Sequence, residues 1–75
     1  MLEMVTIREI EKIFEVTDAL GIHREEVVIP LAPGNPGSVA QEKGKLRIVV
    51  DATADFETWV GGLEARIRAV RPERP

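Results

Sequence analysis

Apolar residues recur at helical spacing near both ends of this chain, and they alternate as in a β-strand only between those ends. The helical stretches cover residues 7–20 and 54–70, and each carries its apolar residues along one side. A helix with a single apolar stripe has to bury that stripe against another layer. The chain is therefore predicted to fold with two helices packed against whatever forms between them.

Short polar signals mark the ends of both helices. Thr6 and Glu9 have the spacing of a capping box, and Gly21 stands where a left-handed C-terminal cap is expected. Thr53 is the expected N-cap of the second helix, which should end before Pro72. These signals set the predicted bounds at residues 7–20 and 54–70.

Three short β-branched or alternating stretches lie between the helices. Residues 27–31 form an expected edge strand, because Pro30 lacks the amide that a central strand needs. Residues 38–41 and 46–50 are expected to pair as a tight hairpin. The prediction is an α+β fold in the order helix-strand-strand-strand-helix, with a three-stranded antiparallel sheet and both helices on one face. It forms one domain over residues 1–75, with 1–5 and 71–75 expected to fray.

Composition supports a folded chain of modest stability. Apolar residues make up 44% and charged residues 31% of the 75, which argues against disorder. Only Phe14, Phe56 and Trp59 are aromatic, so a partner subunit could supply buried surface that the chain lacks. There is no cysteine, no signal peptide and no apolar run long enough to span a membrane, so we expect a cytoplasmic protein. Seven arginines against three lysines would suit a thermophile.

The net charge of −3 is unevenly distributed and disfavours nucleic acid as a partner. Residues 1–65 hold 6 basic and 12 acidic side chains, whereas residues 66–75 hold 4 and 1. Arginines near a helix C-terminus complement the helix dipole, which explains this asymmetry without any ligand. A nucleic-acid accessory protein that uses these C-terminal arginines remains an alternative: Arg66, Arg68, Arg71 and Arg74.

The most unusual feature is a pair of glycines, Gly61 and Gly62, inside the second predicted helix. Each costs about 1 kcal/mol relative to alanine in a helix interior, so either they break the helix or a close contact offsets the loss. On a helical wheel they share the side opposite the apolar stripe with other small residues, which indicates a packing surface. Trp59, at the edge of that side, is a candidate anchor. The predicted interface residues are Thr58, Trp59, Gly61, Gly62, Ala65 and Ala69.

Nothing in the sequence marks a catalytic, cofactor or metal site. The loop at residues 32–37 could offer amides to a phosphate through Gly34, Asn35 and Gly37, but it lacks the Lys-Ser/Thr of a nucleotide-binding loop. His23 and Ser38 are unique in the chain and have no partner spacing that indicates a triad. We therefore expect no catalytic residue, no cofactor and no metal. The prediction is a small non-catalytic interaction or regulatory module that self-associates through residues 54–70, most simply as a homodimer. A small-ligand or phosphate-binding protein using the 32–37 loop is a further alternative.

Overall fold

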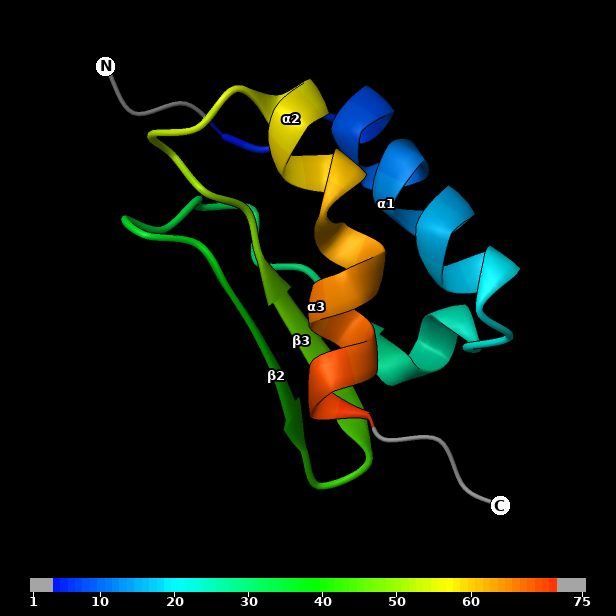
Figure 1. Ribbon diagram of the computed structural model, residues 1–75. Helices are drawn as coiled ribbons and strands as arrows, with labels where there is room; N and C mark the ends of the chain where they lie inside the picture. The colour runs from blue at the N-terminus through cyan, green and yellow to red at the C-terminus, as the bar shows by residue number, and fades with distance from the viewer. Residues whose placement is uncertain (1–3, 72–75) are drawn as a thin grey trace.

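A computed structural model of the protein describes residues 4–71, which adopt an α+β fold as predicted (Figure 1). No helix in that range is both long and apolar enough to cross a membrane. Fraying was expected at residues 1–5 and 71–75, of which 1–3 and 72–75 lie outside the described residues. Within the described part, Val5 is buried and its amide donates to the Leu31 carbonyl at 2.7 Å. The elements, in chain order, are α1 (Ile7–Ala19), the 3-10 helix η1 (Arg24–Glu26), β1 (Val27–Val28), β2 (Ser38–Glu42), β3 (Lys45–Val49), α2 (Phe56–Gly61) and α3 (Leu63–Val70).

The three-stranded sheet is mixed, so the prediction of an antiparallel sheet was wrong. The strand order is β1-β3-β2, with β1 parallel and β2 antiparallel to β3. Residues 29–37 are too many for a tight hairpin, so β2 does not have to lie beside β1. The chain leaves a gap between these two strands, and β3 fills it after turning at Lys43 and Gly44. Strand β1 is an edge strand, as Pro30 indicated, although it extends over only two residues.

Helix α1 follows the sequence signals closely. The Thr6 hydroxyl accepts from the Glu9 amide at 3.2 Å, and the Glu9 carboxylate accepts from the Thr6 amide at 3.0 Å. The helix ends at Ala19, one residue before the predicted end, and Gly21 follows with φ of 78°. Residues with a side chain rarely adopt this backbone conformation, which explains why a glycine occupies position 21.

The second predicted helix is two helices. Its N-cap is Asp55 rather than Thr53, because the Asp55 carboxylate accepts from the Thr58 amide at 3.1 Å, whereas Thr53 donates to Asp51. Gly62 lies outside the helical region with φ of −100° and ψ of 3°, and it separates α2 from α3. The glycines were expected either to break the helix or to make a close packing contact, and the break is therefore present at Gly62.

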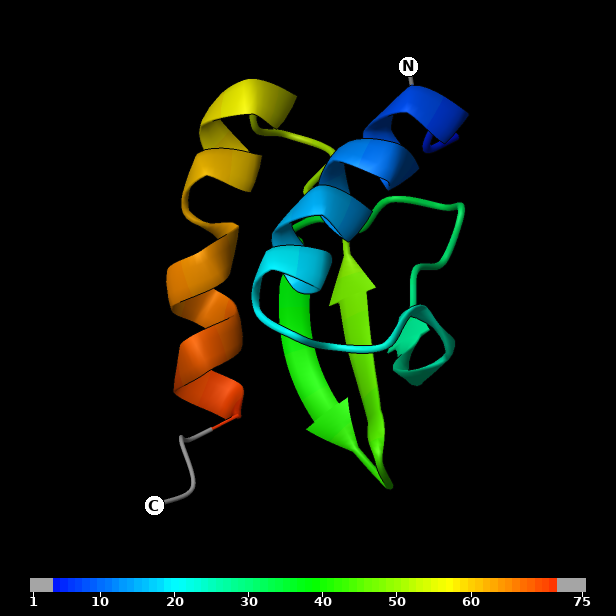
Figure 2. The same cartoon turned by 90° about the vertical axis from the view of Figure 1, so that its right-hand side faces the viewer.

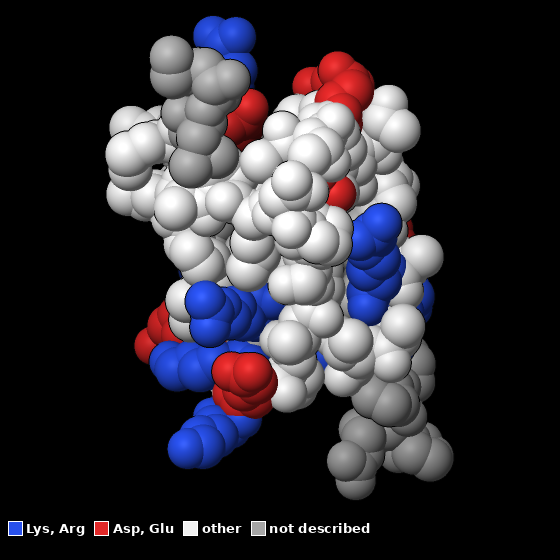
Figure 3. Space-filling model, turned by 90° about the vertical axis from the view of Figure 1, so that its left-hand side faces the viewer, with Lys and Arg blue, Asp and Glu red and all other residues white. Residues whose placement is uncertain are grey.

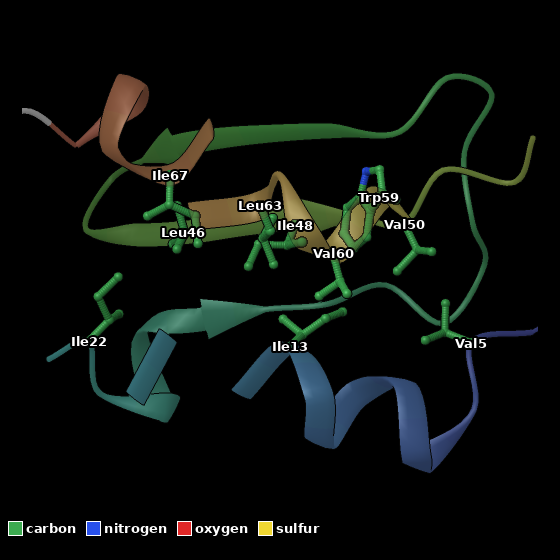
Figure 4. Packing of buried hydrophobic residues seen from close by; sticks show 10 residues of the cluster. All are labelled: Val5, Ile13, Ile22, Leu46, Ile48, Val50, Trp59, Val60, Leu63 and Ile67. Atoms are coloured by element: carbon green, nitrogen blue, oxygen red, sulfur yellow. The ribbon is translucent and has the colours of Figure 1, made fainter. Parts of the chain in front are cut away.

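The α-helices lie on one side of the sheet (Figures 1 and 2), and the buried core lies between these layers. Strand β3 runs through the middle of the sheet and directs alternate side chains into that space. Helices α1, α2 and α3 supply the opposing side chains (Figure 4). The buried core consists of Val5, Ile13, Ile22, Leu46, Ile48, Val50, Trp59, Val60, Leu63 and Ile67.

Candidate interaction surface

Five of the six predicted interface residues are exposed, and together they are here called the small-residue stripe: Thr58, Gly61, Gly62, Ala65 and Ala69. A Cβ atom added at Gly61 would meet no atom within 4 Å. One added at Gly62 would meet only the Trp59 carbonyl oxygen, at 3.9 Å. No contact within residues 4–71 therefore explains why these two positions lack side chains.

Trp59, the sixth residue, lies in the core rather than on the stripe. Its side chain is 5% exposed and packs near Val50 and Val60 (Figure 4). The Phe56 ring lies 5.9 Å away, measured between ring centroids. The indole Nε1 is buried and has no hydrogen-bond partner among the described residues. An indole N–H normally finds an acceptor when buried, so this atom is a local weakness of the core.

The structure places strand β2 beside the flank of α3 that carries the stripe, which the sequence analysis missed. Val39 from β2 lines a shallow hollow of about 260 Å³ together with Arg66, Ala69 and Val70. The Arg71 guanidinium donates to the Gln41 side chain at 3.2 Å. No local sequence signal links residues that lie thirty positions apart, so this pairing could not be predicted from the sequence.

Basic side chains concentrate on the same side of the molecule. The β2–β3 hairpin and α3, residues 38–50 and 63–71, carry six basic and two acidic side chains. The rest of residues 4–71 carries three basic and nine acidic ones. Figure 3 views the molecule from the side of β2, and blue side chains outnumber red ones over its lower half.

The C-terminal arginines do not form a separate cluster. Arg68 pairs with Glu64 at 2.8 Å, Arg71 lies 3.6 Å from Glu26, and Arg66 borders the hollow beside β2. Arg74 lies outside the described residues. Arg66, Arg68 and Arg71 therefore belong to the basic surface of the β2–β3 hairpin and α3.

The 32–37 loop uses its glycines to pack against the end of β3. The Gly34 amide donates to the Val50 carbonyl at 2.8 Å, and the Gly34 carbonyl accepts from Ala52 at 2.7 Å. Gly37 is buried, and a Cβ atom there would lie 2.6 Å from the Asp51 amide nitrogen. Asn35 is exposed. The Gly34 amide is therefore already engaged within the chain and is not available to a phosphate.

A hollow of about 420 Å³ has three carboxylates in its lining, each of which already accepts hydrogen bonds. Glu9 and Asp55 cap α1 and α2, and Asp51 accepts from the amide and hydroxyl of Thr53. Within the described part of the chain, no group of three ligating side chains is placed to hold a metal ion. His23 and Ser38 are both exposed, at the start of η1 and of β2.

No protein-family model matches this chain, and no curated protein or solved structure is significantly similar to it. The functional proposal is therefore based on the geometry and charge of the surface. Three features of that surface carry it: the small-residue stripe is exposed, strand β2 pairs with β3 on one side only, and basic side chains lie near both.

Asp51 should make the fold sensitive to acid. Hydrogen bonds from the Thr53 hydroxyl and amide hold the pKa of the Asp51 carboxyl below its ordinary value. The unfolded chain then binds a proton at this site more readily than the folded chain, so the stabilisation is complete above pH of about 4 and is lost as the pH falls through the folded pKa. We expect the urea concentration at the unfolding midpoint to decrease as the pH is lowered below about 4. Asp51→Asn should flatten this dependence, whereas Glu57→Gln, at an exposed carboxylate, should leave it unchanged; equal slopes in the two variants would contradict the assignment.

Proposed function

We propose that this protein is a small, non-catalytic interaction or regulatory module that self-associates through the small-residue stripe. The observation that carries the proposal is the exposed stripe itself, with two glycines that no contact within the described chain accounts for. A solvated helix face ordinarily carries long polar side chains, whereas small residues let another backbone approach closely. Gly61 lies within α2, where a glycine lowers helix stability by about 1 kcal/mol relative to alanine, a loss that a close intermolecular contact would offset.

The size of the chain favours the same proposal. A domain of 75 residues buries only about 60 to 65% of the surface that its unfolded chain exposes. Contact between two copies would add buried surface next to α2 and α3, which are the two shortest α-helices of the fold. A two-fold homodimer is the commonest arrangement that such contact produces, and a cytoplasmic location remains part of the proposal.

Sedimentation equilibrium tests the stripe with a pair of matched variants. Ala65→Arg places a long charged side chain in the middle of the stripe and should weaken self-association at least about tenfold, because it prevents close approach. Ala19→Arg makes the same change at an exposed helical alanine on α1 and should leave association unchanged. A parent protein that remains strictly monomeric at high concentration, or equal association of both variants, would refute the proposal.

A further inference from the structure

The sheet has two edges, and only one of them is protected. Strand β1 is two residues long and is soon followed by Pro30, which has no amide to offer. Strand β2 is five residues long, contains neither proline nor lysine, and pairs with β3 on one side only. Natural proteins usually blunt such an edge, because its free backbone groups are a template for another strand.

The hairpin register identifies the free backbone groups. The two-residue turn at Lys43 and Gly44 is flanked by the pair Glu42 and Lys45, which exchange hydrogen bonds in a hairpin of this kind. Bonding pairs alternate along an antiparallel ladder, so Ala40 also bonds to β3. The backbone groups of Val39 and Gln41 therefore point away from the sheet. Neither residue makes a backbone hydrogen bond with the loops, turns or caps of the described chain.

Basic side chains border this edge on both faces of the sheet. Arg66, on α3, lines the hollow that includes Val39. Arg47 lies directly opposite Ala40 on the face of the sheet that points away from the core, and it is exposed. A strand added to β2 would direct alternate side chains toward these two positions. Acidic side chains on the added strand would complement both.

We propose that the free edge of β2 binds an acidic, extended segment of a partner protein as a fourth strand of the sheet. Backbone hydrogen bonds at Val39 and Gln41 supply affinity, and the surrounding basic side chains select for negative charge. This site extends beyond the self-association proposed above, because it uses the edge of β2 rather than the stripe on α2 and α3.

Two other occupants fit the edge less well. The β2 strand of a second copy carries a single acidic side chain, Glu42, so it would complement the arginines beside this edge poorly. Single-stranded nucleic acid would need aromatic rings on which to stack its bases. Trp59 is buried, and the partly buried Phe56 packs on it. The Phe14 ring is covered by the Arg24 guanidinium, 4.7 Å from its centroid. Phosphates also offer no donor for the free carbonyls of β2.

Two capped peptides test the proposal: one alternates glutamate with threonine, and the other has lysine in place of each glutamate. Titration into the isotopically labelled full chain, followed by amide NMR, should show the acidic peptide binding at least about tenfold more tightly. Hydrogen exchange should slow at the Val39 and Gln41 amides, and the Ala40 amide, already bonded to β3, should change little. Arg66→Glu should weaken binding about tenfold, whereas the same change at Arg8, exposed on α1, should have no effect.

Several results would overturn the edge site. These are equal binding of the two peptides, unchanged exchange at Val39 and Gln41, or tighter binding of an oligothymidylate of the same length. Protection of these two amides that grows with protein concentration alone would show instead that a second copy occupies the edge. Ala65→Arg separates the two proposals, because it should weaken self-association at least about tenfold without weakening the binding of the acidic peptide.

Discussion

Gly37→Ala is expected to destabilise the fold by about 3 kcal/mol, because the new methyl group has no space to occupy. A Cβ atom at this position would lie 2.6 Å from both the Asp51 amide nitrogen and the Val49 carbonyl oxygen. Both are backbone atoms, so no side-chain rotation relieves the clash, and the 32–37 loop has to move away from the end of β3. A domain of this length has about 4 to 11 kcal/mol of stability, so the loss is a large fraction of the total. Urea denaturation followed by far-ultraviolet circular dichroism measures it.

Gly61→Ala is the control for that substitution, because the same methyl group meets no atom within 4 Å at Gly61. At a concentration where the protein is monomeric, this variant should match the parent or exceed its stability by up to about 1 kcal/mol, since alanine favours a helix. If Gly37→Ala were as stable as Gly61→Ala, the loop would not pack against Val49 and Asp51 as described.

Local signals predicted the parts of this fold that depend on neighbouring residues. The Thr6 and Glu9 capping box, the αL position at Gly21 and the hairpin turn after Glu42 all depend on contacts within a few residues, and all are present. Sheet topology depends instead on the course of residues 29–37, which has no local signal. An antiparallel sheet was expected because hairpins join consecutive strands, but β3 separates β1 from β2.

The start of the second helix shows two local signals in competition. Thr53 and Asp55 are both acceptable N-caps. Asp51 decided between them, because its carboxylate binds the amide and hydroxyl of Thr53 and leaves Asp55 to cap α2. A break at Gly62 was one of the two expectations, because glycine lowers the stability of a continuous helix. Low helix stability alone does not decide whether the helix breaks or continues.

The candidate interaction surface could be predicted only in part. A helical wheel shows which residues share one side of a helix, but it does not show which other elements the helix packs against. The wheel grouped Thr58, Gly61, Gly62, Ala65 and Ala69, and all five are exposed. It placed Trp59 at the edge of that group, whereas Trp59 is buried in the core, where its ring packs on Phe56. The free edge of β2 was not predicted, because Pro30 marks the opposite edge of the sheet, beside β1.

Trp59→Ala is expected to be among the most destabilising substitutions, at about 3 to 5 kcal/mol, because it empties a large buried site beside Val50 and Val60. Trp59→Phe should lose far less. The smaller ring leaves a gap, but it also removes the buried Nε1–H, whose lack of a partner costs about 1 to 3 kcal/mol, so the net change should lie within about 1 kcal/mol. Circular dichroism is the appropriate measurement, because the substitution removes the only tryptophan. The pair of variants also separates a core role from an interface role. A tryptophan that anchored the interface would leave the monomer stable when replaced by alanine and would weaken only self-association, whereas the buried Trp59 should reduce stability even at concentrations where no dimer forms.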